Sequence, residues 1–140
     1  MTLRSNCVTF AAGLALMIAS GAALAAEGNA ENGKKLFFSS AQCKICHSDK
    51  KGVKRVGPSL FGVYGRKCGA STKQHYSSNY QAACAKTHWV WDEKTLDPYL
   101  KDPSAYISSL SGKNMRSPMT RQTAKPQDRA DIIAFLKTLK

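Results

Sequence analysis

The clearest periodic pattern of apolar residues lies at the C-terminal end of the chain. In "PQDRADIIAFLKTLK", residues 126–140, the apolar positions recur at i, i+3, i+4 and i+7: Ile132, Phe135, Leu136 and Leu139. This spacing gathers them on one face of an amphipathic α-helix. Pro126 near the start and Asp128 in the first turn favour a helix that begins there.

A second helix is predicted in "NAENGKKLFFSSAQCKICH", residues 29–47. Either Asn29 or Asn32 can cap its start, and Leu36 and Phe37 supply an apolar patch. The pattern therefore predicts a helix that runs toward the cysteines at the end of this segment.

A third helix is predicted in "DEKTLDPYLKDPSAYI", residues 92–107, which begins at Asp92. Pro98 lacks a backbone N–H and crowds the preceding turn, so we expect this helix to be short or bent. Elsewhere the chain lacks the long alternating runs of Val, Ile and Thr that are typical of strands. The pattern as a whole predicts an all-α fold of about three to five helices joined by irregular loops.

The N-terminal segment has the features of a secretory signal peptide. A single arginine precedes an apolar run over residues 8–18, which ends in the small residues "ALAA" before the chain turns polar. The run is too short to favour a membrane span, although an uncleaved anchor is the alternative. We expect residues 1–25 to be removed, with cleavage after Ala26 as the alternative. Residues 26–140 then form one domain, since no internal repeat or Pro/Gly-rich linker divides them.

The chain is strongly basic, with 21 Lys and Arg against 9 Asp and Glu. The predicted signal peptide removes one arginine, so the exported chain keeps a net charge of about +11. A domain of this size has a modest core, and a large bound cofactor or a disulfide would stabilise it considerably.

Two of the four exported cysteines lie in the pentad "CKICH", which has the C-x-x-C-H spacing of c-type haem attachment. In that chemistry two thiols add to the two vinyl groups of a haem, and the adjacent histidine becomes an axial ligand of the iron. We therefore predict that Cys43 and Cys46 hold one haem covalently and that His47 ligates its iron.

Two alternative uses of the pentad are less well supported. A thioredoxin-like redox pair would lie in a βαβ pattern, which is not visible here, and a zinc site would need a second closely spaced pair of ligands.

The other two cysteines, Cys68 and Cys84, are 16 positions apart. In an oxidising compartment they are predicted to form a disulfide worth about 3 kcal/mol, with two free buried thiols as the alternative.

With these motifs in place, the chain resembles class I cytochrome c, the soluble carriers of the bacterial periplasm and of mitochondria, over nearly the whole exported length. "GKKLF", which begins at Gly33, is similar to the first helix of that family, and "DIIAFLKTLK" to the last. The resemblance implies a class I cytochrome c fold wrapped around one haem. It also implies that Gly33 lets these two helices cross closely and that Phe37 contacts Ile132 and Phe135.

The segment "GPSLFGVYGRK" resembles the family's loop on the histidine side of the haem. The resemblance implies that the carbonyl of Pro58 accepts the second ring N–H of His47, which would fix the tautomer of the ligand. It also implies that Arg66 lies near a haem propionate; a solvated charge is the alternative.

Two further segments resemble parts of the family that face the haem. "HYSSNYQAAC" is similar to the segment with a propionate-bonding tyrosine, for which we prefer Tyr76 to Tyr80. In "VWDEKTLDPYL", Trp91 matches the propionate-bonding tryptophan, and Tyr99 matches the tyrosine whose hydroxyl points at the sulfur of the ligating methionine.

The second axial ligand has two candidates, Met115 and Met119, because this chain has a longer connection after Tyr106 than compact family members. The family's methionine stands shortly before the last helix and is commonly followed by threonine, as in Met119–Thr120. Pro118 also disfavours a continuous helix through both methionines. We predict that Met119 is the ligand and that Met115 packs in the loop, with the reverse as the alternative.

Basic residues gather near the pentad and near the two methionines: Lys44, Lys50, Lys51, Lys54, Arg55, Lys113, Arg116 and Arg121. A positive ring around an exposed haem edge would attract and orient acidic redox partners. A contribution to solubility alone is the alternative. Export and the lack of a basic stretch interleaved with aromatic residues argue against nucleic acid.

These features together predict a monomeric periplasmic carrier, without stable membrane insertion, that moves one electron between respiratory or photosynthetic complexes. Its haem c iron would be six-coordinate and low-spin, and the protein would not be an enzyme. One alternative is a small haem peroxidase or gas-binding cytochrome with an open axial site, which would bind cyanide or carbon monoxide rapidly. Another is a haem subunit fixed in a larger complex, which gel filtration would reveal.

Overall fold

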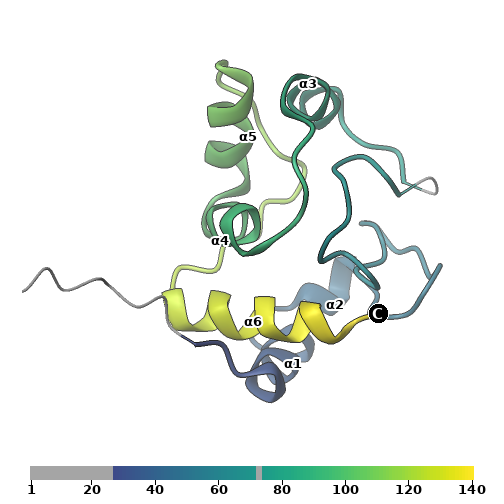
Figure 1. Ribbon diagram of the computed structural model, residues 1–140, viewed down its shortest axis with the longest axis vertical. Coiled ribbons are helices and arrows are strands. Elements are labelled where there is room, and N and C mark those ends of the chain that lie inside the picture. Colours follow the sequence, from purple (N-terminus) through teal and green to yellow (C-terminus); the bar gives the residue numbers. More distant parts are fainter. Residues whose placement is uncertain (1–26, 72–73) are drawn as a thin grey trace, which may run out of the picture.

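The computed structural model describes residues 27–71 and 74–140, and in this part the fold consists of helices joined by irregular loops (Figure 1). The predicted signal peptide, residues 1–25, lies outside this part. Within it there are six helices and one isolated bridge between Lys67 and Val90. The helices are α1 Ala30–Phe38, α2 Cys43–Cys46, α3 Ser78–Thr87, α4 Glu93–Lys101, α5 Pro103–Ser111 and α6 Pro126–Thr138. The all-α prediction is confirmed, with one helix more than the expected three to five.

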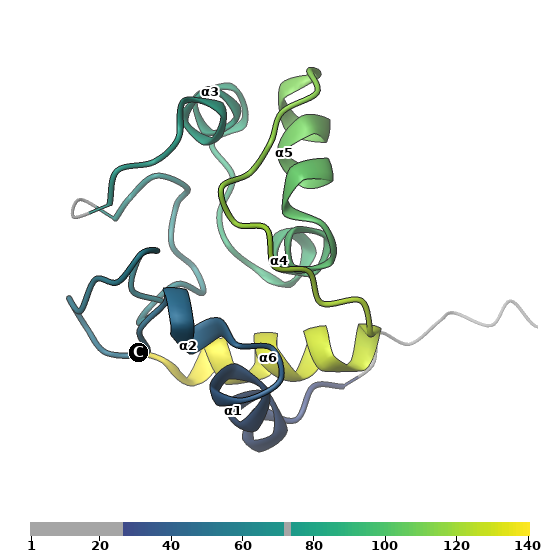
Figure 2. The same ribbon diagram turned by 180° about the vertical axis from the view of Figure 1, so that it is seen from behind.

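The crossing of α1 over α6 is the most closely packed contact between helices, and both views show it (Figures 1 and 2). A Cβ atom at Gly33 would lie 1.9 Å from the carbonyl oxygen of Asp131, so only glycine allows the two backbones to approach this closely. Beside the crossing, the rings of Phe37 and Phe135 meet edge to face with centroids 5.4 Å apart. The predicted role of Gly33 and the predicted contact of Phe37 with Phe135 are confirmed.

A buried carboxylate adds polar bonds to the same crossing. Asp131 is 2 % exposed and accepts hydrogen bonds from the backbone N–H of Asn29 at 2.8 Å, the side chain of Asn32 and the amide of Gln127 at 2.9 Å. Burial alone would raise the pKa of Asp131, but these three donors outweigh it and lower the pKa. The carboxylate therefore stays ionised and joins the start of α1 to α6.

The segment that was expected to hold one short or bent helix forms two, α4 and α5. The side chain of Asp92 and that of Thr95 form a capping box at the start of α4. Pro98 is accommodated inside α4, and the break falls at Asp102, which ends α4 and accepts a hydrogen bond from the backbone N–H of Ala105 at 2.9 Å. One aspartate therefore both ends one helix and caps the next.

The predicted disulfide between Cys68 and Cys84 is present and joins the loop between α2 and α3 to α3 itself. Helix α3 packs against α5 on the side of the molecule away from α1. Near the other end, the backbone N–H of Gly62 donates to the carbonyl of Leu139, which ties the C-terminus to the loop after α2. None of the helices in the described ranges is long and apolar enough to cross a bilayer.

Candidate cofactor site

A cavity of about 950 Å³ lies between the α1–α6 pair and the α3–α4 side of the molecule. Its apolar lining includes Phe37 from α1, Leu96 and Leu100 from α4, and Ile132 and Leu136 from α6. The volume is near the upper end of the range of about 300 to 1,000 Å³ for ligand and cofactor pockets. Most of the predicted chemistry-bearing residues line this one cavity.

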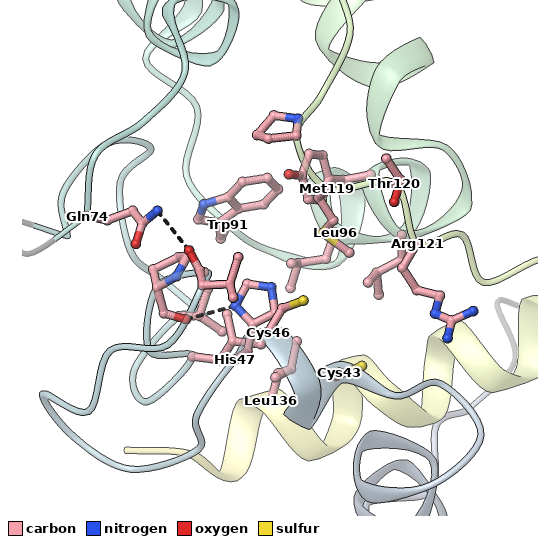
Figure 3. A pocket seen from close by; sticks show the side chains of 18 of the residues that line it. Cys43, Cys46, His47, Gln74, Trp91, Leu96, Met119, Thr120, Arg121 and Leu136 are labelled. Atoms are coloured by element: carbon pink, nitrogen blue, oxygen red, sulfur yellow. Dashed lines mark hydrogen bonds between the residues drawn. The ribbon is translucent and has the colours of Figure 1, made fainter.

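The pentad forms the floor of the cavity. Cys43 and Cys46 are the two ends of the single turn α2, and both are free thiols that line the cavity (Figure 3). Burial raises the pKa of the Cys43 thiol to about 11, although its own backbone and the nearby Arg121 partly offset this effect. The turn begins after Gln42, whose φ of 55° is unusual for a residue other than glycine.

His47 follows the turn and is held from behind by the loop at Gly57 and Pro58. Its Nδ1 donates to the carbonyl oxygen of Pro58 at 2.8 Å, as predicted, so Nε2 keeps a free lone pair. Burial lowers the pKa of His47, and the Pro58 carbonyl offsets part of this shift. A Cβ atom at Gly57 would lie 2.4 Å from Cε1 of the imidazole, so a glycine is required beside this ring.

The predicted Arg66 also reaches the cavity wall. Its guanidinium donates to the carbonyl oxygens of Ser59, at 2.9 Å, and Phe61, and it is therefore fixed against the same loop. Two backbone carbonyls hold this cation in place, and part of it faces the cavity.

Three aromatic side chains with predicted roles line the other wall, together with Tyr80, the alternative to Tyr76: Tyr76, Trp91 and Tyr99. The rings of Tyr76 and Tyr80 stack with centroids 4.6 Å apart, and their hydroxyls accept backbone N–H groups of Ser71 and Gly69. Trp91 and Tyr99 meet edge to face at 4.8 Å. Both tyrosines of the segment "HYSSNYQAAC", Tyr76 and Tyr80, therefore line the cavity.

The two methionines take different places. Met119 lines the cavity and, in Figure 3, lies across from Cys46 and His47, whereas the residues that line the cavity do not include Met115. Met115 instead packs against the core from the segment that returns along α5. Ser117 lies between them, 6 % exposed, and its hydroxyl accepts the backbone N–H of Met119 at 3.2 Å.

The side chains around the cavity fit a covalently bound haem c. Two thiols on one helical turn, an imidazole with a free Nε2 and a thioether on the facing wall are the donor set of such a haem. The space between them is large and mainly apolar, and the glycine behind His47 leaves room for the ring of the ligand. The arrangement suits redox chemistry of a bound iron more than acid–base chemistry.

Sequence reasoning missed two residues that shape the site, Gly57 and Ser117. Gly57 stood in the quoted loop, and its position beside a predicted ligand was a signal that could have drawn attention to it. Ser117 had no such signal, because a serine hydroxyl that accepts an N–H two positions ahead is common in loops and leaves no distinctive pattern.

Comparisons with known proteins all point to one family. The family model described as Cytochrome c matches residues 30–140. Cytochrome c-550 of Novispirillum itersonii is 45 % identical over 100 residues, which cover 70 % of this chain and 89 % of that protein. Cytochrome c2 of Rhodospirillum rubrum is 41 % identical over 128 residues, 90 % of this chain and 91 % of the relative.

Solved structures give the same result. Cytochrome c2 from Paracoccus denitrificans superimposes with a TM-score of 0.71 at 29 % identity, covering 80 % of this chain and 96 % of the other. Ferricytochrome c2 from Rhodopseudomonas palustris gives 0.70 at 34 % identity, with 80 % and 99 % covered.

Proposed function

The chain belongs to the cytochrome c family, and from this premise we propose that His47 and Met119 are the two axial ligands of its haem iron. Cys43 and Cys46 form the thioether bonds that hold the haem. Proteins of this family are monohaem electron carriers with one covalently attached haem c, and they are not enzymes. The chain therefore carries electrons between redox partners.

The observation that supports this ligand set is the position of His47 and Met119 on facing walls of one cavity that also holds both free thiols. A bound haem supplies one-electron chemistry at its iron. A thioether opposite an imidazole raises the reduction potential of such an iron, and two protein ligands leave no open position for a substrate. Both properties suit a carrier.

The polar side chains of the cavity would hold the propionates of the haem. We assign this role to Arg66, Tyr76 and Trp91, because all three line the cavity and each offers an N–H or O–H donor. Tyr99 lies beside Trp91 on the same wall and would face the methionine sulfur.

The surface at the mouth of the cavity would dock an acidic redox partner. Ile45 and Val56 both line the cavity and are 58 % and 79 % exposed, which makes an apolar centre. Exposed basic side chains flank this centre along the chain: Lys44, Lys50, Lys51, Lys54 and Arg55. An apolar centre with a charged rim gives oriented encounter and fast release. The carrier would act as a monomer in the periplasm after loss of residues 1–25.

Replacement of the proposed ligand tests this function. In the holoprotein, Met119→Ala should lower the reduction potential and allow cyanide to bind rapidly, because one axial position is freed. Met115→Ala is the matched control and should keep the wild-type potential. Loss of methionine ligation in Met115→Ala instead of Met119→Ala would overturn the assignment.

Docking has a separate test. Electron transfer to an acidic partner should slow as salt rises, because screening weakens the attraction between opposite charges. Lys54→Gln should slow it at low salt more than Lys94→Gln, which removes the same charge from α4 away from the cavity lining. Equal effects of the two variants would contradict docking at the cavity mouth.

A further inference from the structure

Three serines on one face of α5 contact the segment that leads to Met119. Ser104, Ser108 and Ser111 occupy positions i, i+4 and i+7 of α5, a spacing that places their hydroxyls on one side of the helix. All three are half-buried, and each hydroxyl bonds to the backbone of residues 113–117. We call these residues the serine ladder.

The ladder contacts every second residue of the returning segment. The hydroxyl of Ser104 accepts the backbone N–H of Ser117 at 3.0 Å, and that of Ser108 accepts the N–H of Met115 at 2.9 Å. Ser111 accepts the N–H of Lys113 at 3.1 Å. Residues 113, 115 and 117 therefore run antiparallel to α5 with one pleated edge toward it.

The helix and the returning segment have comparable lengths between the first and the last rung. Seven residues of helix rise about 10.5 Å between the first and the last serine. Four residues of extended chain span about 13 Å, which is close enough for all three pairs to form together. On the opposite edge, the carbonyl of Arg116 accepts the side chain of Asn79 at 3.1 Å, so the segment lies between α5 and α3 (Figure 2).

The middle rung holds Met115 in place. Ser108 bonds to both polar backbone atoms of Met115, since its hydroxyl also lies 3.1 Å from the Met115 carbonyl oxygen. Beyond the last rung the segment enters the cavity wall, which residues 118–122 line. A slip of the segment along α5 that brought Met115 to the place of Met119 would break the rungs at Ser104 and Ser108, whereas the bond between Ser111 and Lys113 is local to the turn.

We propose that the serine ladder is a positioning device that sets the register of this segment, so that Met119 faces the cavity and Met115 does not. The inference rests on the proposed ligation by Met119. The bond between a thioether and iron is weak, so its lifetime depends on how firmly the protein backbone holds the sulfur. The ladder would supply that hold through hydroxyl groups of a neighbouring helix.

The chain allows an unusually direct test, because Met115 and Met119 are the only methionines after residue 25. Labelling the methionine methyl groups of the reduced holoprotein with ¹³C should give two NMR signals, one of them strongly shifted by the haem. Met115→Leu and Met119→Leu assign the two signals. Cyanide binding to the ferric holoprotein then measures how often the sulfur leaves the iron.

We expect Ser104→Ala/Ser108→Ala to accelerate cyanide binding by about fivefold for each hydrogen bond lost and to broaden or split the shifted methyl signal. Alanine favours helix more than serine does, so α5 should persist. Ser109→Ala is the matched control, since Ser109 bonds only within α5. Ser108→Thr, added to Ser104→Ala, keeps the middle hydroxyl and should recover part of the wild-type rate.

The outcomes separate the two claims. If the shifted methyl signal of the wild type belongs to Met115 or is absent, the proposed ligation itself is wrong. If it belongs to Met119 but the double serine variant keeps the wild-type cyanide rate and a single shifted signal, the ladder does not position the ligand. Equal acceleration in Ser109→Ala would also overturn the inference, because a general change of α5 would then explain it.

Discussion

The two sides of the cavity are built from different interactions. The histidine side, which consists of α1, α2, α6 and the loop at residues 57–66, depends on close backbone packing at Gly33 and Gly57 and on aromatic contact. On the methionine side, which consists of α5 and residues 112–125, α5 joins the aromatic core through Tyr106, which meets Trp89 and Tyr99 edge to face. The segment 112–125 itself is held by hydroxyl groups, by a buried arginine and by backbone hydrogen bonds.

This difference bears on how each proposed ligand can move. Close-packed backbones separate only when the whole contact opens, so the histidine side should be rigid until the protein unfolds. Individual hydrogen bonds contribute about 1 kcal/mol each and can open one at a time. The methionine side should therefore open locally while the histidine side stays folded.

The largest effect is expected from breaking the histidine side at its crossing. Gly33→Ala places a Cβ atom against the carbonyl of Asp131 and forces α1 away from α6. We expect a loss of about 3 to 4 kcal/mol in the free energy of unfolding, measured with denaturant. Lys34→Ala, at the exposed neighbouring position, should change it by less than about 0.5 kcal/mol.

Removal of the disulfide should destabilise the methionine side more than the histidine side. Cys68→Ala/Cys84→Ala frees the loop that α3 closes, at a cost of about 3 kcal/mol in the chain-entropy model. Because α3 packs on α5, hydrogen exchange should speed up first in α3, α5 and the segment near Met119. Equal loss of protection in α1 and α6 under native conditions would contradict a boundary between the two sides.

A buried cation, Arg129, is one link between the methionine side and the rest of the protein. Arg129 is 6 % exposed, pairs with Asp97 at 2.7 Å, and donates to the carbonyls of Thr123 at 3.0 Å and Ala124 at 2.7 Å. Arg129→Lys cannot reproduce all these bonds and should cost about 2 kcal/mol. It should also accelerate cyanide binding to the holoprotein.

Two measurements test the prediction for Arg129→Lys. Stability is followed with denaturant, and ligand exchange is followed from the cyanide rate at the same temperature. Lys125→Gln, a neighbouring exposed position, should leave both unchanged. A fall in stability without faster exchange would show that Arg129 supports the fold but not the methionine segment.

The smallest effect is expected on the acid stability of the histidine side, through Asp131. The lowered pKa of Asp131 in the folded state stabilises the protein above about pH 4, the ordinary range of an aspartate, and this stabilisation is lost as the pH falls through the lowered folded value. Asp131→Asn should therefore be less stable at neutral pH, and its free energy of unfolding should change less steeply as the pH falls into the acid range. Glu31→Gln, at an exposed position on α1, should leave the steepness of the acid dependence as in the wild type.

Much of the histidine side could be predicted from the sequence, because its signals are local. The spacing of Ile132, Phe135 and Leu136 indicated α6, and the pentad indicated the attachment turn. The bond from His47 to Pro58 was implied by the resemblance of residues 57–67 to a loop of the family. A periodic apolar face and a short motif both survive in the sequence without knowledge of distant contacts.

The methionine side and α3 were harder to predict. Helix α3 buries only Tyr80 and Ala83, so its sequence lacks a strong apolar period. The break at Asp102 follows from Pro103, which favours an extended conformation at the residue before it, and from the capping side chain of Asp102. Pro98, by contrast, lies inside α4. The serine ladder joins residues that are separated along the chain by a turn, and serine is common in loops for unrelated reasons. Ligation by Met119 stays a prediction.

The bond between the N–H of Gly62 and the carbonyl of Leu139 has a practical consequence for attaching the protein to surfaces. Lys140 ends beside the loop that supports the proposed histidine ligand (Figure 1). A tag added there would pull first on Gly62 and only through it on His47. For immobilisation on an electrode, a short flexible spacer after Lys140 should shield this loop from mechanical load, and the tether would leave the methionine side free.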